Sequence, residues 1–212
     1  MQTVTEMALM GAERGVFTRG QAALWARSRG PRLDGLLKRA VGEGELLRLK
    51  KGLYCLSDRY LRHRIEPLAV AQQLHGPSYV SLETALSYHG WIPEGVRIIA
   101  SVTSKRSCSF ETPLGLFTFT RVPQRRFLAG VRRTSAGENG AFLLATALKA
   151  LADLVYVQRR DWQSARPVIE SLRVDEADLK TLTGDLFDEV QSAYKPGRVS
   201  RFLDGLRRDL NL

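Results

Sequence analysis

Hydrophobic residues between positions 31 and 56 follow two different periods. Five of them recur at the spacing that places side chains on one face of a helix: Leu33, Leu36, Leu37, Ala40 and Val41. This spacing predicts a helix that begins near Pro31 and buries one side. From residue 45 onward the period is two, since leucines alternate with basic residues, and Lys51-Gly52 supplies a turn. The segment therefore predicts a helix followed by a β-hairpin.

Two more helices are predicted upstream of this pair. Thr18 and Gln21 have the spacing of a capping box, in which each side chain bonds a free amide of the first helical turn. Thr3 and Glu6 repeat the spacing at the start of a helix over residues 3–14. Helices followed by a basic helix and a hairpin are typical of a winged helix-turn-helix. We predict such a domain over residues 1–62.

Beyond residue 62 the pattern is mixed, which predicts a C-terminal domain of helices and strands over residues 63–212. The fold class is α+β. The pattern predicts strands at 79–80 and 96–102 and a hairpin at 110–122. Helices are expected at 65–75, 81–90, 137–157, 161–172, 175–193 and 198–210. The domain is therefore expected to end in helices, with Ser81 as the N-cap of one of them.

The charge of the chain indicates the kind of partner that it binds. The 212 residues carry a formal net charge of +10, and residues 1–62 hold 12 Lys and Arg against 6 Asp and Glu. Residues 63–212 hold 20 against 16. Over half of the excess therefore lies in less than a third of the chain. A basic excess of this size favours a polyanionic partner.

The outward face of the predicted 31–41 helix is the candidate DNA-reading surface. Arginine and lysine can bond guanine edges in the major groove, and a glycine lets the helix approach closely. Base readout is assigned to Arg32, Gly35, Lys38 and Arg39. The backbone of double-stranded DNA is assigned to residues that flank this helix or lie on the hairpin, which are Arg27, Arg29, Arg48, Lys50 and Lys51.

A second basic cluster lies in the C-terminal part of the chain. Its members fall within thirteen residues that contain no acid, and they are Arg121, Arg125, Arg126, Arg132 and Arg133. A solvated loop is the simpler interpretation. The alternative is a surface that extends the DNA footprint or contacts an RNA.

Candidate chemistry is sparse. The two cysteines, Cys55 and Cys108, are isolated, no metal-ligand spacing or glycine-rich phosphate loop occurs, and no cofactor is expected. Without a signal peptide or a membrane span, the chain is expected to be cytoplasmic. The titratable residues left for catalysis are Glu83, His89, Glu94, Glu111 and Asp153. A nucleic-acid-processing enzyme with a C-terminal active site is the alternative to a non-enzymatic DNA-binding protein.

Two further segments carry a family resemblance. Residues 79–94 read Tyr-Val-Ser-Leu-Glu-Thr-Ala-Leu-Ser-Tyr-His-Gly-Trp-Ile-Pro-Glu, and residues 149–153 read Lys-Ala-Leu-Ala-Asp. Together with the basic hairpin and with residues 102–106 and 110–117, these segments resemble the AbiEi family over about residues 17–157. That family comprises the antitoxins and autoregulators of type IV toxin–antitoxin systems. The chain departs from that family's pattern at Ala147-Leu148, where the family has Pro-Glu.

The resemblance implies a bacterial cytoplasmic repressor that binds inverted repeats in its own promoter. It also implies that the C-terminal domain counters a co-transcribed nucleotidyltransferase toxin, without a stable complex between the two proteins. The periodicity and spacing of the chain carry the DNA-binding prediction by themselves. The antitoxin prediction comes from the resemblance.

Overall fold

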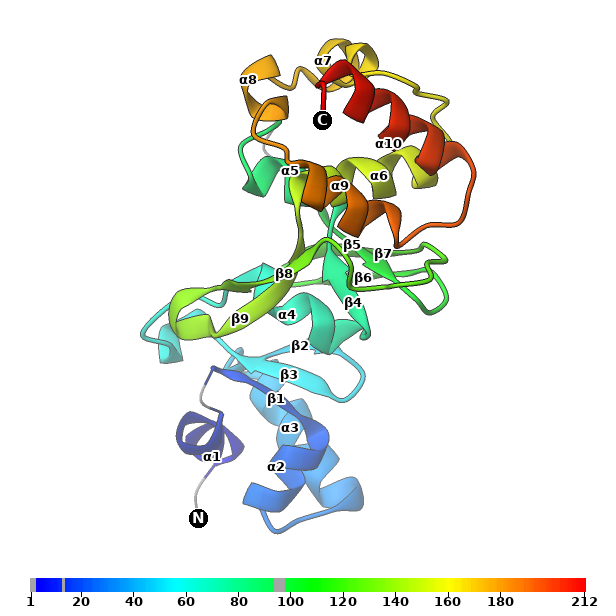
Figure 1. The fold of residues 1–212 in the computed structure, drawn as a ribbon. Coiled ribbons are helices and arrows are strands. Elements are labelled where there is room, and N and C mark those ends of the chain that lie inside the picture. The colour runs from blue at the N-terminus through cyan, green and yellow to red at the C-terminus, as the bar shows by residue number, and fades with distance from the viewer. Residues whose placement is uncertain (1–2, 13, 94–97) are drawn as a thin grey trace.

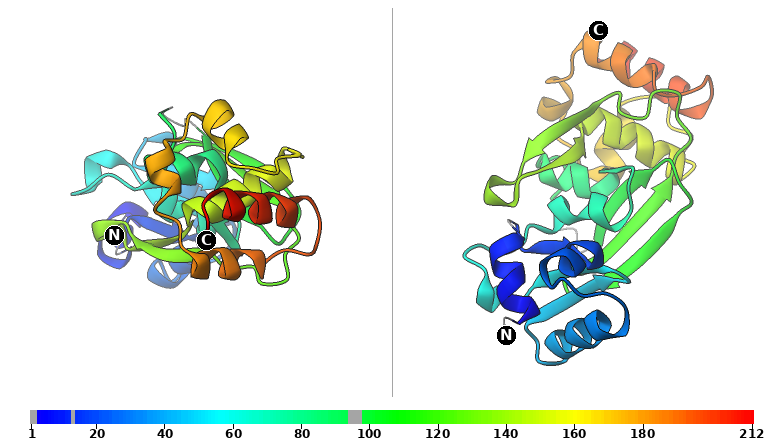
Figure 2. Two further views of the ribbon diagram at one scale, coloured as in Figure 1. Left: turned by 45° about the horizontal axis from the view of Figure 1, so that its top comes forward. Right: turned by 90° about the horizontal axis from the view of Figure 1, so that it is seen from below.

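The chain has a mixed α+β architecture. The computed structural model describes residues 3–12, 14–93 and 98–212, and these residues form ten α-helices and two β-sheets (Figure 1). The first three helices lie at one end of the molecule and the last helices at the other, with the larger sheet between them, as the right-hand view of Figure 2 also shows. In the described part of the chain, no helix is both long and apolar enough to cross a membrane.

We call the elements from α1 to β3 the N-terminal unit. They are α1 (Val4–Gly11), β1 (Val16–Thr18), α2 (Arg19–Trp25), α3 (Gly30–Gly42), β2 (Leu46–Lys50) and β3 (Leu53–Leu56). The three strands form an antiparallel sheet in the order β1-β3-β2. Both predicted capping boxes are confirmed, since the side chain and backbone of each pair exchange hydrogen bonds. Strand β1 was not predicted.

The central strand of the small sheet, β3, is buried on both faces. Side chains alternate across a strand, so Tyr54 and Leu56 of β3 pack in one hydrophobic cluster with the N-terminal helices. Leu53 and Cys55 point the other way and belong to the large cluster of the C-terminal part. All four side chains are buried. The hydrophobic packing therefore crosses the predicted domain boundary at residue 62.

We call the elements from α4 to α10 the C-terminal body. Its six-stranded sheet has the order β6-β7-β5-β4-β9-β8, with β5/β7 and β4/β9 parallel and the other neighbours antiparallel. The strands are β4 (Ser78–Val80), β5 (Ile98–Thr103), β6 (Cys108–Thr112), β7 (Gly115–Arg121), β8 (Val131–Ser135) and β9 (Ala141–Ala145). The helices are α4 (Pro67–Leu74), α5 (Leu82–Tyr88), α6 (Ala147–Val157), α7 (Arg166–Leu172), α8 (Glu176–Leu179), α9 (Gly184–Gln191) and α10 (Arg198–Asp209).

Three predicted helices of this body are wrong in extent, one of which, at 161–172, begins only at Arg166, and strand β8 was not predicted. In the predicted helix at 137–157, Gly137–Asn139 is a short 3-10 turn, Ala141–Ala145 is strand β9, and α6 begins only at Ala147. A short apolar run has no period that separates a buried strand from a helix, and β9 pairs on both sides in the sheet. The predicted helix at 175–193 is two helices, α8 and α9. The prediction at 96–102 holds from Ile98 onward, and residues 96–97 lie outside the described residues.

A buried polar network lies where α6 meets the large sheet. Lys149 and Asp153, one helical turn apart, are both completely buried, and Lys149 Nζ lies 3.3 Å from Asp153 Oδ1. The Asp153 carboxylate also accepts hydrogen bonds of 2.5–2.9 Å from Tyr79, Ser81, Gln124 and Tyr194. Ser81 occupies the predicted N-cap position of α5 but makes no capping bond with its side chain, because its hydroxyl is donated to Asp153.

The lysine, aspartate and tyrosine side chains of the network are all buried. Burial lowers the pKa of Lys149, and the Asp153 carboxylate opposes that shift. Burial also raises the pKa of Tyr79 and Tyr194 well above the usual value, so both hydroxyls stay protonated and donate to the carboxylate. Removing one partner of a buried ion pair leaves an uncompensated charge, which costs more stability than the intact pair contributes.

We therefore expect Asp153→Ala to lower the free energy of unfolding by about 3–5 kcal/mol. Urea unfolding measures this loss. The double variant Lys149→Met/Asp153→Ala should lose less than the single variant, because no unpaired charge is left inside. The exposed pair Arg166–Glu170 supplies the control, and Glu170→Gln should leave the unfolding midpoint unchanged. Equal losses in the single and double variants would contradict the explanation by an unpaired charge.

Candidate nucleic-acid interface

Helix α3 presents one open face to solvent. Gly30 has a positive φ of 62°, and Pro31 lies in the first turn of the helix. Leu33, Leu37 and Ala40 are buried against the other N-terminal helices. Their spacing leaves the opposite side of α3 uncovered, which is the face that the sequence assigned to DNA.

The four predicted base-reading residues are all exposed on this face. Gly35 lies at its crest, where an added Cβ would meet no atom within 4 Å. Arg32 and Arg39 are two helical turns apart on one flank of the crest. The Arg39 Nε lies 2.9 Å from Glu43 Oε1, and the Arg39 side chain is 78% exposed, so this pairing leaves its guanidinium open to solvent. Lys38 lies on the other flank, toward the hairpin.

A groove separates α3 from the β2–β3 hairpin. Its volume is about 720 Å³, and Leu37, Val41 and Tyr54 form its apolar part. Lys38 lines it from the helix, and Arg48 and Lys51 line it from the hairpin. The groove therefore has an apolar floor between two basic walls.

Lys50 does not take part in this surface. The register of β2 against β3 shifts between Arg48 and Lys50, so a bulge breaks the alternation that placed both on one face. Lys50 points to the C-terminal body, where its Nζ donates to the Leu74 carbonyl at 2.5 Å and lies 5.8 Å from the centre of the Phe110 ring. Burial lowers the pKa of Lys50. The structure thus turns the half-buried Lys50 side chain toward the C-terminal body, away from the groove that Arg48 and Lys51 line.

Arg27 and Arg29 lie between α2 and α3 and are exposed. With Leu24, which is 72% exposed, they line a second hollow of about 710 Å³ beside α2. Arg27 has a positive φ of 45°, which turns the chain sharply into α3. These two arginines therefore extend the open face of α3 at its N-terminal end.

The sequence reading missed one ion pair at the groove. Arg19, the first residue of α2, contacts Asp34 of α3 through two hydrogen bonds: Nε to Oδ1 at 2.7 Å and Nη2 to Oδ2 at 3.1 Å. Both residues line the groove. They lie fifteen positions apart in different helices, and no local spacing connects such a pair.

The second basic cluster is divided by its partners. Arg132 forms a two-bond pair with Glu189, with Arg132 Nη1 2.8 Å from Glu189 Oε1, and this pairing lowers the pKa of Glu189 to about 2. Arg126 donates to the Ser192 hydroxyl. Among the described residues, no carboxylate pairs with Arg121, Arg125 or Arg133, and all three are exposed. Only part of the predicted cluster therefore offers unpaired positive charge.

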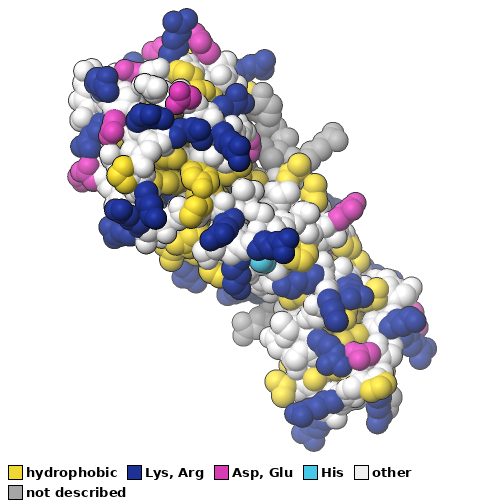
Figure 3. Space-filling view, turned by 90° about the vertical axis from the view of Figure 1, so that its right-hand side faces the viewer, with side chains coloured by type: hydrophobic (Ala, Val, Ile, Leu, Met, Phe, Trp, Pro, Cys, Tyr) yellow, Lys and Arg dark blue, Asp and Glu magenta, His cyan; other side chains and the backbone are white. Residues whose placement is uncertain are grey.

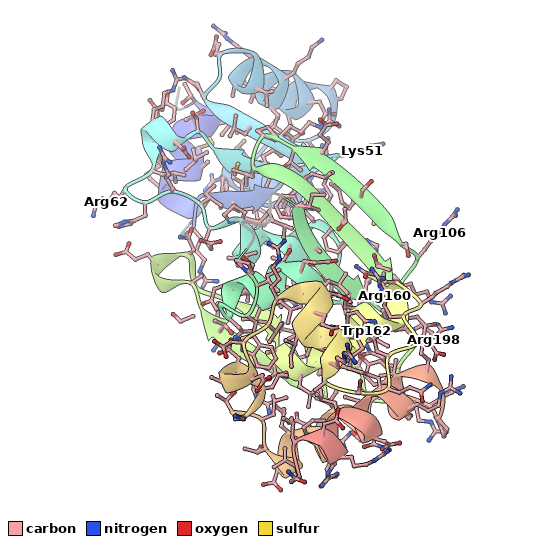
Figure 4. The ribbon with its side chains drawn as sticks, turned by 90° about the horizontal axis from the view of Figure 1, so that it is seen from above. Lys51, Arg62, Arg106, Arg160, Trp162 and Arg198 are labelled. Carbon is pink, nitrogen blue, oxygen red and sulfur yellow. The ribbon has the colours of Figure 1, made fainter. Side chains whose placement is uncertain are left out.

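Basic side chains are also frequent on the side of the molecule that carries Lys51. Figure 3 shows Lys and Arg over both ends of this side, with few acids between them. Figure 4 places Lys51 of the hairpin on the same side as Arg106, Arg160 and Arg198 of the C-terminal body, opposite Arg62. Arg160 lies with its guanidinium carbon 5.8 Å from the centre of the Trp162 ring. The basic side therefore begins at the hairpin and continues along the body.

The residues considered for catalysis do not converge. Asp153 is buried and fully engaged, whereas Glu83 accepts a hydrogen bond from Gln158 and His89 is exposed, with Nε2 2.8 Å from the Ala145 carbonyl. Glu111 lies on β6, and Glu94 lies outside the described residues. Within the described chain, no three His, Cys, Asp or Glu side chains are placed to hold a metal ion.

The open face of α3, the groove beside it and the basic walls are thus defined by geometry and charge. A scan against protein-family models and a search of curated proteins gave no match to this chain.

Proposed function

We propose that this chain is a DNA-binding transcriptional repressor whose residues 1–62 act as a winged helix-turn-helix. The observation that carries the proposal is the open face of α3 beside a groove with basic walls. Lys38, Arg48 and Lys51 line that groove from both sides. A helix with basic side chains around an exposed crest suits the major groove of DNA, which is about 12 Å wide.

The proposed contacts divide into two kinds. Arg32, Gly35, Lys38 and Arg39 approach base edges, and Gly35 allows close approach because nothing lies over it. The DNA backbone is contacted by Arg27, Arg29, Arg48 and Lys51. Phosphate contacts fix the register of the protein on the duplex, while base contacts select the sequence. Lys50 is left out of this set because its ammonium bonds the Leu74 carbonyl.

We further propose, from the resemblance to the AbiEi family, that the chain represses its own promoter at inverted repeats in the bacterial cytoplasm. In the same proposal the C-terminal body counters a nucleotidyltransferase toxin without forming a stable complex. The two segments that carry the resemblance meet in one buried network. The first contributes Tyr79 and Ser81, and the second contributes Lys149 and Asp153. The DNA-binding proposal is independent of this resemblance.

Replacing Lys38 tests base readout. We expect Lys38→Ala to weaken binding to a selected duplex on the order of tenfold, with a smaller loss on random duplex, since a base contact discriminates between sequences. Gel-shift titrations at fixed salt measure both affinities. Lys180 is exposed at the end of α8 and gives a control of equal charge, Lys180→Ala, which should bind as the wild type does. Equal losses on both duplexes in Lys38→Ala would contradict the assignment.

Lys51 and Lys50 are neighbours with opposite expected behaviour. The slope of log affinity against log salt concentration is negative. Lys51→Ala should make it shallower by about one, because one phosphate contact releases about one counterion. Lys50→Ala should leave the slope unchanged, since its ammonium is bonded within the protein. The measurement is a series of binding titrations from low to high salt. A slope made as shallow by Lys50→Ala as by Lys51→Ala would contradict the two placements.

The antitoxin proposal is tested by growth. The gene beside this one is expected to encode a nucleotidyltransferase, and co-expression of the full-length chain should restore growth that the toxin arrests. Lys38→Ala should still restore growth when expressed from an unrelated promoter, because the C-terminal body carries the antitoxin activity in this proposal. Failure of the wild-type chain to restore growth would remove the antitoxin role and leave the DNA-binding role intact.

A further inference from the structure

One acid interrupts the basic surface that faces the groove. Among the described residues that line the groove, Asp34 is the single carboxylate, and Arg19, Lys38, Arg48 and Lys51 are cations. A carboxylate at this place repels phosphate and weakens binding to any nucleic acid. Its presence on the same helix face as Lys38 therefore calls for a reason other than affinity.

Stability does not supply that reason. Asp34 bonds Arg19 with two parallel hydrogen bonds, and the pairing raises the pKa of Arg19 and lowers that of Asp34. The two side chains are nevertheless 40% and 56% exposed. Ion pairs this open to solvent add little to folding stability, since water screens them and both side chains lose freedom.

The position of the Arg19–Asp34 pair explains the presence of Asp34 better than stability does. The backbone amide of Arg19 donates to the Gly52 carbonyl at the hairpin turn, at 2.9 Å, while its side chain holds Asp34 of α3. Arg19 thus connects the three elements that border the groove: α2, α3 and the hairpin. The pair also occupies the Arg19 guanidinium, which would otherwise be available to any phosphate.

We propose that Asp34 sets the sequence specificity of the groove by acting against non-specific DNA. The carboxylate accepts hydrogen bonds only, so it is compatible with a base edge that presents an amino group, such as the N4 of cytosine, and it repels a phosphate. At the same time it withholds Arg19 from phosphate contacts. Asp34 therefore lowers affinity for arbitrary duplexes more than for the duplex that fits, which is selection by an unfavourable contact. This inference rests on the proposed function.

The test uses the full chain and two duplexes. One is obtained by selecting a random double-stranded library on the wild-type protein, and the other has a random sequence of equal length. Asp34→Asn keeps the size of the side chain and removes its charge. We expect this variant to bind the random duplex on the order of tenfold more tightly at low salt, with little gain on the selected duplex. Its salt slope on the random duplex should steepen by about one, because Arg19 is released.

A matched control separates local from overall charge. Glu170 of α7 pairs with Arg166 at the same 2.7 Å Nε contact, and both side chains are exposed. Glu170→Gln makes the same change in net charge away from the groove and should shift affinity for both duplexes equally and slightly. Arg19→Gln gives a second variant with the opposite expectation, since it leaves Asp34 unpaired and should weaken random binding more than selected binding.

The outcomes are distinct. A fall in the ratio of selected to random affinity for Asp34→Asn, with no fall for Glu170→Gln, supports the inference. An unchanged ratio, or a rise in affinity equal on both duplexes, overturns it and leaves the DNA-binding proposal standing. If the wild-type chain binds no duplex, the proposed function itself fails. Unfolding midpoints confirm that each variant is folded, and if Asp34→Asn is unfolded, the Arg19→Gln ratio decides.

Discussion

The burial of β3, the central strand of the sheet β1-β3-β2, on both faces is the constraint on which the N-terminal surface depends. Tyr54 and Leu56 pack toward the three helices, while Leu53 and Cys55 pack toward the C-terminal body. A two-stranded hairpin alone is marginally stable in water. Here both faces of β3 exclude water, and Lys50 adds a bond to the Leu74 carbonyl. The hairpin is therefore held in place by the body as well as by its own helices.

Within the C-terminal body, the Asp153 network holds separate elements of the fold together. It joins α6 to the end of β4, to Gln124 in the segment after β7 and to Tyr194 in the segment after α9. The backbone amide of Arg125 donates to the Ala193 carbonyl beside it. The segment that carries Gln124 and Arg125 is therefore held by hydrogen bonds to the Asp153 carboxylate and to the Ala193 carbonyl. A network with every partner satisfied specifies one arrangement, because each alternative leaves a buried polar group unbonded.

The same network explains what residues 79–94 and 149–153 contribute to the fold. Tyr79 and Ser81 lie in the first segment, and Lys149 and Asp153 lie in the second. All four side chains are buried, and Tyr79, Ser81 and Lys149 each donate a hydrogen bond to the Asp153 carboxylate. These residues therefore maintain the core of the body. In the proposed function, the antitoxin activity belongs to the surface that this core supports.

The elements that the sequence predicted well are those with local signals. The capping boxes at Thr3 and Thr18 and the apolar stripe of α3 depend on residues at most eight positions apart, and helices with such signals form as expected. Strand β9 was assigned to a helix because its five residues have no period of their own, and its partners β4 and β8 come from distant parts of the chain. Pairing in a sheet is decided by tertiary contacts, which a local pattern does not contain.

Two features of the candidate site were beyond the sequence for the same reason. The bulge in β2 that turns Lys50 toward the body is a property of its pairing with β3, and the alternating pattern gave no sign of it. The Arg19–Asp34 pair joins two helices across fifteen positions. The sequence located the open face of α3 and its exposed basic residues. It could not separate Lys50 from Lys51 or find the acid among the cations.

The attachment of the hairpin to the body also bears on how a bound duplex would lie. Strand β2 lies beside β6 of the body, so the groove and the body keep one relative position. The side that carries Lys51 also carries Arg106, Arg160 and Arg198 (Figure 4). A duplex that lies on α3 and the hairpin has a direction fixed by those two elements. Positive charge farther along that side lowers the electrostatic energy of the phosphates that lie there. In the proposed function the body therefore shapes DNA binding through its position, with the N-terminal unit supplying the sequence-reading contacts.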